Sequence, residues 1–335
     1  MTSKDDEDKN LWHMTDSELH HFRECLADRH ACACFLKIAA SLDGLTASVT
    51  SNHPRGSLIL DEPNLVRRCH DEWRRLVARA IDGGRLEDLP QDARWPAAYL
   101  DSLQAFVRYR GNAWRLRQLK SWMRGQALLD YGCGNGEFAM QMWGAGLFDR
   151  VLGIDVEDTR HEMARAVLPF AKVDFAGAAL AAEELQPLRR LAEGGTGTLL
   201  HVLHHLHDRI AGPRHVLENL GALGLERIVI VEDVPVGLDE YKRMTCGIDV
   251  CVEALASYLA LAEEGQLHSL ALCDFFFNVL LLGADTMPLP CGFRSIAGWK
   301  QVLRETGWKL TAAIPLCFPR GYALPSAYCA LIADR

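Results

Sequence analysis

The chain has 335 residues, of which 49% are hydrophobic and 24% charged, and its formal net charge at pH 7 is −8. This composition suits a folded globular protein larger than a minimal domain, and an acidic chain without a basic cluster is a poor match for nucleic acid, whose phosphates are neutralised by grouped Lys and Arg. Eleven cysteines without regular spacing predict reduced and mostly buried thiols.

The first part of the chain is predicted to be helical. Residues 1–10 are polar and lack the apolar core of a signal peptide, so we expect a cytoplasmic protein. Helical patterns cover residues 15–26, 63–81 and 95–123, and Thr15 with Glu18 matches a capping box. We therefore expect an N-terminal helical domain over residues 1–122.

A glycine-rich turn follows the first apolar run that suits a buried strand. Residues 127–131 lead into Gly132, Gly134 and Gly136, and a second apolar run ends about twenty residues later in Asp155. Glycine is needed where backbone turns sharply and a ligand lies directly against it. This pattern predicts a nucleotide pocket in which Asp155 meets a ribose.

Strands and helices then alternate. Further strands are predicted at residues 170–174, 196–202, 227–233, 308–315 and 327–333, and helices at 159–168, 178–192, 213–223 and 295–306. The alternation predicts an α/β fold with a Rossmann-like, doubly wound parallel sheet. The catalytic domain would cover residues 123–335 and carry a helical insertion at 235–292.

The glycine spacing separates two classes of ligand. The dinucleotide fingerprint is G-x-G-x-x-G, with a pyrophosphate at the helix N-terminus. Here the spacing is G-x-G-x-G, and Glu137 stands where the last glycine of that fingerprint belongs, so its carboxylate would repel a phosphate. Together with Asp130 before the turn, this segment resembles motif I of the class I S-adenosylmethionine-dependent methyltransferases.

The resemblance covers residues 125–233 and 295–335. It implies a seven-stranded sheet whose last two strands form a hairpin, with the seventh strand antiparallel. It also implies S-adenosylmethionine as the cofactor, with the three glycines under its methionine portion, Asp155 on both ribose hydroxyls, and Asp174 and Phe175 at the adenine. Asn135 and Glu137 would place the methionine amine or carboxylate, or else cap the helix that follows. The implied cofactor-binding set is Asp130, Gly132, Gly134, Asn135, Gly136, Asp155, Asp174, Phe175 and His201.

A histidine cluster follows the fourth predicted strand and comprises His201, His204, His205 and His207 with Asp208. Zinc would require three or four converging ligands, but no paired cysteines accompany these histidines, and the Leu-His-His-Leu segment resembles the metal-free exit from strand four in the same family. We assign no metal. A histidine that titrates near neutral pH can instead accept a proton from a nucleophile, although a histidine satisfied by backbone remains an alternative.

The predicted catalytic residues are His201, His204 and Glu232. Glu232 and Asp233 end the fifth strand, where ligands meet in open α/β sheets, and are predicted to bind a cationic group of the substrate. A basic segment that includes Arg115 is predicted to form a solvated helix face or to hold a carboxylate. The N-terminal helices and the insertion would form a lid that excludes water.

The apolar run at residues 269–282 raises the question of a membrane. It covers about fourteen residues and includes Asp274 and Asn278, whereas a helix that spans hydrocarbon needs about twenty apolar residues. A buried helix is therefore predicted, and no membrane partner.

The sequence thus predicts a methyltransferase acting on a small molecule, such as an amino acid derivative or a compound of secondary metabolism. Two alternatives use the same pocket. One is a reaction that consumes S-adenosylmethionine without methyl transfer, by closure of a four-membered ring or transfer of the aminocarboxypropyl group, with release of methylthioadenosine. The other is a non-catalytic binding protein. The oligomeric state and the acceptor atom are not predicted.

Overall fold

The computed structural model describes residues 15–50, 65–95, 99–100, 112–173, 182–206, 212–244, 253–281, 288–318, 322–323 and 327–335. The chain forms two compact units: a helical unit of residues 1–106 and 253–291, and a sheet unit of residues 107–252 and 292–335. The sequence prediction set one boundary at residue 122 and placed the whole 235–292 insertion with the catalytic domain. In the structure, residues 253–291 group with the N-terminal helices.

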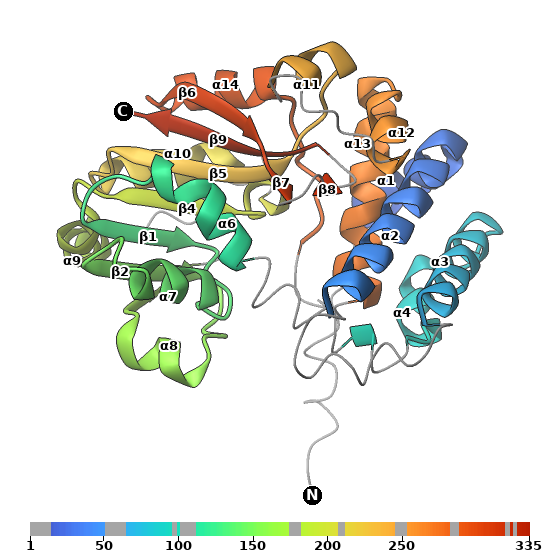
Figure 1. Ribbon diagram of the computed structural model, residues 1–335, viewed down its shortest axis with the longest axis horizontal. Helices are drawn as coiled ribbons and strands as arrows, with labels where there is room; N and C mark the ends of the chain where they lie inside the picture. The colour runs from blue at the N-terminus through green and yellow to red at the C-terminus, as the bar shows by residue number, and fades with distance from the viewer. Residues whose placement is uncertain are drawn as a thin grey trace, which may run out of the picture. The chain divides into compact units, whose positions relative to one another are not determined.

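The sheet unit contains a seven-stranded sheet of order β3-β2-β1-β4-β5-β9-β6 (Figure 1). Strands β1 to β5 pair in parallel, whereas β9 pairs antiparallel with both β5 and β6. The predicted fold class, a class I methyltransferase sheet with an antiparallel seventh strand, is confirmed. The strands are β1 Ala127–Tyr131, β2 Arg150–Asp155, β3 Phe170–Lys172, β4 Thr196–Leu200, β5 Arg227–Asp233, β6 Lys309–Pro315 and β9 Tyr328–Asp334.

Helices cover the sheet, as expected for strands that are apolar on both faces. In Figure 1, α6 lies in front of the sheet and α14 behind β6 and β9. Trp114 of α6 and Phe138 of α7 belong to one buried apolar cluster with Val229 and Val231 of β5. The helices of this unit are α6 Asn112–Leu119, η4 Lys120–Trp122, α7 Glu137–Gly144, α8 Glu162–Val167, α9 Ala182–Ala192, η5 Leu203–His205, α10 Gly212–Ala222, α11 Leu238–Met244 and α14 Ile296–Glu305.

Three local features of the sheet unit differ from the predicted strands. Strand β4 ends at Leu200, two residues early, because His201 adopts a left-handed conformation with φ of 55°. The β6–β9 register shifts between Leu310 and Ala312. A short hairpin of β7 Cys317–Phe318 and β8 Tyr322–Ala323 was not predicted.

The helical unit begins with the predicted capping box. The Glu18 backbone N–H donates to the Thr15 hydroxyl, and the Glu18 carboxylate accepts from the Thr15 N–H and from the Leu289 N–H. Glu18 thus connects the first helix to the second segment of the same unit. The helices are α1 Asp16–Ala27, α2 Arg29–Thr50, α3 Leu65–Ile81, η2 Leu86–Asp88, α4 Leu89–Asp92, α12 Glu253–Leu259, α13 Glu263–Asp274 and the π-helix η6 Phe275–Leu281.

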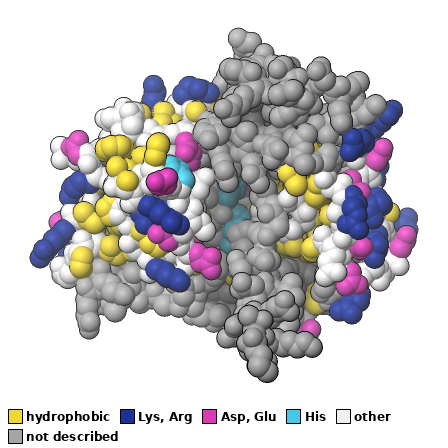
Figure 2. Space-filling model, turned by 90° about the horizontal axis from the view of Figure 1, so that it is seen from below, with side chains coloured by type: hydrophobic (Ala, Val, Ile, Leu, Met, Phe, Trp, Pro, Cys, Tyr) yellow, Lys and Arg dark blue, Asp and Glu magenta, His cyan; other side chains and the backbone are white. Residues whose placement is uncertain are grey.

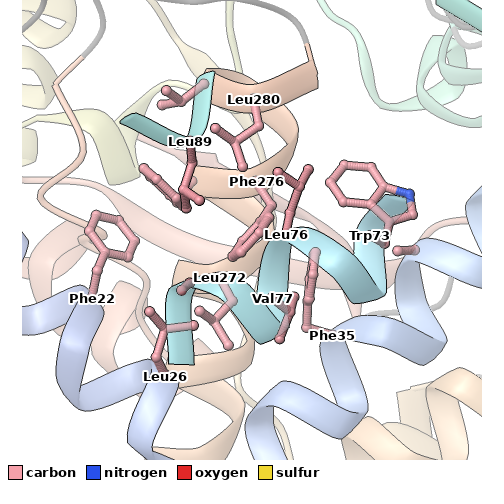
Figure 3. Packing of buried hydrophobic residues seen from close by; sticks show 14 of the residues in the cluster. Phe22, Leu26, Phe35, Trp73, Leu76, Val77, Leu89, Leu272, Phe276 and Leu280 are labelled. Atoms are coloured by element: carbon pink, nitrogen blue, oxygen red, sulfur yellow. The ribbon is translucent and has the colours of Figure 1, made fainter. Parts of the chain in front are cut away.

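Aromatic and aliphatic side chains together form the core of the helical unit (Figure 3). The Phe22 and Phe275 rings are 4.9 Å apart, and the Phe35 and Phe276 rings 4.8 Å apart. The apolar run at residues 269–282 therefore lies in a buried α-helix that continues as a π-helix, as far as the chain is described. None of the described helices is long and apolar enough to cross a membrane.

Candidate active site

The glycine turn between β1 and α7 is built around three positive φ angles. The N–H groups of Gly132 and Cys133 both donate to the carbonyl of Ile154 at the end of β2, at 2.7 and 3.1 Å. A Cβ on Gly132 would lie 2.2 Å from the Cγ2 atom of Val202. Gly132 is therefore required by the close approach of β1 to the segment after β4.

The other two glycines have different surroundings. Among the described residues, a Cβ on Gly134 would meet no atom within 4 Å, whereas one on Gly136 would lie 2.9 Å from the Cβ of Ala164. Gly136 thus permits the turn to pack against α8. Gly134 leaves a stretch of backbone that a ligand can approach without steric hindrance.

Asp155 ends β2 directly beside this turn. Its Oδ2 atom accepts a hydrogen bond from the Gly134 N–H at 2.7 Å, and its Oδ1 atom accepts one from the Val156 N–H at 2.7 Å. Burial raises the pKa of Asp155, although the backbone N–H groups of Gly134, Val156 and Glu157 favour its charged form. A carboxylate has about four acceptor sites, so Asp155 can still accept from a hydroxyl donor beside these N–H groups.

Asp130 lies beneath the turn and is 2% exposed. Its Oδ1 atom accepts a hydrogen bond from the Thr198 hydroxyl at 2.7 Å. Burial raises the pKa of Asp130 to about 7, and the negative charge of Asp155 acts in the same direction. Asp130 therefore connects the end of β1 to the neighbouring strand β4.

Asn135 and Glu137 contact a histidine that the sequence analysis did not single out. The Asn135 side chain accepts from the Glu137 N–H at 3.1 Å, as a helix cap does, and its carbonyl accepts from the His161 N–H at 3.1 Å. His161 Nδ1 accepts from the Ala164 N–H, and its Nε2 atom lies 3.3 Å from Glu137 Oε2. Because Nδ1 accepts the Ala164 N–H, the proton of the neutral His161 ring is on Nε2, the nitrogen nearer to Glu137.

Glu232 and His204 form a buried pair at the tips of β5 and β4. The Glu232 Oε2 atom lies 2.6 Å from His204 Nδ1, and Glu232 Oε1 accepts from the Leu203 N–H at 2.9 Å. The carboxylate thereby places the proton on Nδ1 and the lone pair on Nε2. The His204 ring also stacks on Phe293, with ring centres 4.4 Å apart.

His201 belongs to a stack of three rings. Its ring lies parallel to that of Tyr328, 4.7 Å away, and Tyr328 stacks on Trp114 at 6.1 Å. The His201 Nδ1 atom is 3.9 Å from the Asp233 carboxylate, and a third of the His201 side chain is exposed. Burial and the positive charge of Arg115 hold the pKa of His201 well below its usual value, so the ring is neutral at pH 7.

Arg115 and Tyr328 are functional candidates that the sequence analysis did not include in the site. Arg115 Nε donates to the Tyr328 hydroxyl at 2.8 Å, and Arg115 Nη1 donates to Asn112 at 2.9 Å. Burial raises the pKa of Tyr328 to about 12, so the hydroxyl stays protonated. The one sequence signal was the basic segment before the turn, which left open whether Arg115 holds a carboxylate.

Four other predicted residues lie outside the described part of the chain: Asp174, Phe175, His207 and Asp208.

The described side chains on the face shown in Figure 2 include both Lys and Arg and Asp and Glu, interspersed with one another.

Comparison with known proteins gives structural likeness at low identity. No protein-family model and no curated protein matches the chain. Among solved structures, a methyltransferase from Archaeoglobus fulgidus, described as dependent on S-adenosylmethionine, aligns with a TM-score of 0.42 and 16% identity, over 70% of this chain and 98% of that one. Human N-acetylserotonin methyltransferase, solved with S-adenosylmethionine, aligns with a TM-score of 0.40 and 15% identity, over 81% of this chain and 68% of that one. Mitomycin 7-O-methyltransferase aligns with a TM-score of 0.40 and 14% identity, over 79% of this chain and 68% of that one. The fold assignment rests on the strand order and pairing of the sheet itself.

Proposed function

We propose that this protein is an S-adenosylmethionine-dependent methyltransferase that acts on a small molecule. The observation that carries the proposal is the pairing of Asp155 with the glycine turn. The Asp155 carboxylate accepts the Gly134 N–H at 2.7 Å, at a point where a Cβ on Gly134 would meet none of the described residues within 4 Å. An acid and an accessible backbone side by side fit the ribose and the methionine tail of one adenosyl ligand.

The residues present fit this cofactor. The Asp155 carboxylate would accept from the ribose hydroxyls, and charge assistance strengthens such bonds. Gly132, Gly134 and Gly136 would pass beneath the methionine portion. Asp174 and Phe175 remain the proposed adenine contacts.

The same turn disfavours a dinucleotide. Helix α7 starts at Glu137, whose carboxylate occupies the first turn where a pyrophosphate would need backbone N–H groups and positive potential. The Asn135 side chain already accepts the Glu137 N–H, which removes one of those donors. S-adenosylmethionine has no phosphate and meets neither obstacle.

His204 is the proposed general base, and Glu232 its positioning residue. When bound, the cofactor supplies an electrophilic methyl group on a sulfonium. His204 would take the proton that an acceptor hydroxyl or amine must lose for the methyl group to be transferred to it. Glu232 stabilises the resulting imidazolium through its 2.6 Å bond to Nδ1. Because both Glu232 oxygens already accept hydrogen bonds, we propose this role for Glu232 in place of substrate contact.

His201 and Asp233 are proposed to line the acceptor side of the site. The neutral His201 ring, held flat against Tyr328, offers an apolar face and a polar edge. Asp233 is half-buried beside it and suits a cationic or hydroxyl-bearing acceptor. An amino acid derivative or a compound of secondary metabolism carries such groups.

The helical unit is the proposed lid. It has its own aromatic core and joins the sheet unit at residues 106, 253 and 291, so it can move as a body. In that role it would exclude water from the transfer step. Hydrogen exchange tests this: S-adenosylmethionine should slow exchange in α1 to α3 as well as at the glycine turn, and protection confined to the turn would contradict the lid.

Two alternatives remain, and each predicts a different result. Ring closure of the cofactor or aminocarboxypropyl transfer would release methylthioadenosine. A non-catalytic binding protein would bind the cofactor and release nothing. The ordered His204–Glu232 pair favours an enzyme over a binding protein, because a base with a fixed tautomer serves proton transfer.

Calorimetric titration with S-adenosylmethionine and with NADH tests the cofactor assignment. We expect saturable binding of S-adenosylmethionine and none of NADH. Tight NADH binding without S-adenosylmethionine binding would overturn the proposal and restore the dinucleotide interpretation.

A further inference from the structure

The first turn of α6 lies at the carboxyl ends of the central strands. Figure 1 shows α6 starting near the tip of β1 and running back across the sheet. Trp114 and Arg115 of this turn contact Tyr328, which in turn stacks on His201 at the tip of β4. This turn therefore stands beside the glycine turn and the strand tips.

Arg115 is held in place by two of its three guanidinium nitrogens. Its Nε atom donates to the Tyr328 hydroxyl, and its Nη1 atom donates to Asn112. Its Nη2 atom has no hydrogen-bond partner among the described residues. A guanidinium with two nitrogens fixed and one remaining is preorganised to bind an anion.

The positive charge of Arg115 acts on residues at the ends of β1 and β4, the two adjacent strands at which the strand order of the sheet reverses. It opposes the burial that raises the pKa of Asp130, and it adds to the burial that lowers the pKa of His201. Arg115 is thus close to β1 and β4, where the tail of a ligand on the glycine turn would end. The strand tips also carry the carboxylates Asp130, Asp155, Glu232 and Asp233, and a second cation, Arg160, lies beside Gly136 with its guanidinium bound to Asp158.

We propose that Arg115 binds the α-carboxylate of the methionine portion of the cofactor. This inference rests on the proposed function, because it places the adenosyl group on the glycine turn and Asp155. A zwitterionic amino acid tail needs a cation for its carboxylate, and acids alone at the strand tips would repel it. Tyr328 is then a positioning residue that holds the guanidinium through its hydroxyl, and Arg115 makes the site select ligands that carry the carboxylate.

The test compares two ligands that share the adenosine and the sulfur. S-adenosylhomocysteine carries the carboxylate, and 5′-methylthioadenosine lacks the whole amino acid end. In Arg115→Gln, calorimetry should show affinity for S-adenosylhomocysteine reduced roughly 10- to 100-fold, as for loss of a charge-assisted hydrogen bond, with affinity for methylthioadenosine within twofold of the native value. Arg117→Gln, on the same helix with an exposed side chain, is the matched control and should change neither affinity.

Tyr328→Phe and Arg115→Lys provide a second view if Arg115→Gln is unstable. Each variant keeps a cation at this position but loses part of its fixed geometry. Each should therefore reduce the affinity for S-adenosylhomocysteine by less than Arg115→Gln does, and leave the affinity for methylthioadenosine unchanged. Equal losses for both ligands, or no loss for either, would overturn the role of Arg115. Failure of the native protein to bind either ligand would instead overturn the proposed cofactor.

Discussion

The Glu232 carboxylate lies 2.6 Å from Nδ1 of His204, and both side chains are almost completely buried. The two residues come from the tips of neighbouring parallel strands, so the sheet register brings them together. Because the Leu203 N–H occupies the other Glu232 oxygen, the carboxylate has one orientation and His204 one tautomer.

Glu232→Gln tests this pair. A Gln amide can accept one hydrogen bond but would face the second donor with its own N–H₂, which favours the His204 tautomer with the proton on Nε2. We expect product formation to fall about 10²-fold or more while cofactor affinity stays within twofold. Turnover is measured with S-adenosylmethionine and an extract of the source cells. Glu226→Gln, exposed at the opposite end of β5, should retain turnover, and undiminished turnover in Glu232→Gln would remove the pair from the mechanism.

Asp155→Ala should weaken S-adenosylmethionine binding by about 2 to 4 kcal/mol, because it removes the acceptor of two ribose hydroxyls. Isothermal calorimetry measures the loss directly. The matched control is Asp149→Ala, an exposed acid before β2 whose side chain is far from the strand tip, and its affinity should be native. Native affinity in a folded Asp155→Ala protein would mean that the ligand binds elsewhere.

The glycines of the turn should separate stability from binding. Gly132→Ala places a Cβ 2.2 Å from Val202 and strains a positive φ, so the free energy of unfolding should fall by roughly 2 to 4 kcal/mol. Gly134→Ala adds strain without a clash, about 1 kcal/mol, but should abolish most cofactor affinity by intruding on the ligand.

Gly83→Ala is the control for the glycine series, because Gly83 also has positive φ and no atom near its Cβ position, but lies in the helical unit. It should lose a similar stability to Gly134→Ala and keep full cofactor affinity. Equal affinity losses in Gly83→Ala and Gly134→Ala would show that the loss at the turn reflects strain and not ligand contact.

Asp130 should make stability depend on pH. Burial raises the pKa of its carboxyl to about 7 in the folded chain, above the ordinary value near 3.9 in an unfolded one. The folded state is therefore favoured while Asp130 is protonated, and this contribution disappears as pH rises from about 4 to about 7.

Asp130→Asn should remove that dependence. Between pH 4 and pH 7 the native protein should lose roughly 2 to 4 kcal/mol of its free energy of unfolding, and Asp130→Asn should not show this loss. Urea denaturation at several pH values measures both curves. Asp149→Asn should follow the native curve. A native-like pH profile in Asp130→Asn would mean that the pKa of Asp130 is the same in the folded and the unfolded chain.

The sheet could be predicted from sequence because each of its signals is local. Apolar runs, the glycine turn and the acid at Asp155 lie within about thirty residues of one another, and strand order follows from the resemblance they carry. Buried parallel strands also leave continuous apolar runs that are easily seen, as the fully buried β1 shows.

The rest of the site depends on contacts that no local pattern encodes. Arg115 and Tyr328 are 213 positions apart, and they meet only because β9 inserts beside β5. The left-handed His201 gives no composition signal, since glycine is the usual residue there. The pairing of Glu232 with His204, and not with His201, follows from the η5 turn after β4, which turns the His204 ring toward β5.

Analysis of the products formed from S-adenosylmethionine with a deuterated methyl group tests the central claim most directly. The native protein is incubated with this cofactor and an extract of the source cells, and the products are resolved by mass spectrometry. If the protein transfers methyl groups, S-adenosylhomocysteine forms in equal amount to a small molecule that has gained the labelled methyl, and both are lost in Glu232→Gln. Labelled methylthioadenosine without a methylated product would contradict methyl transfer and identify one of the alternative reactions.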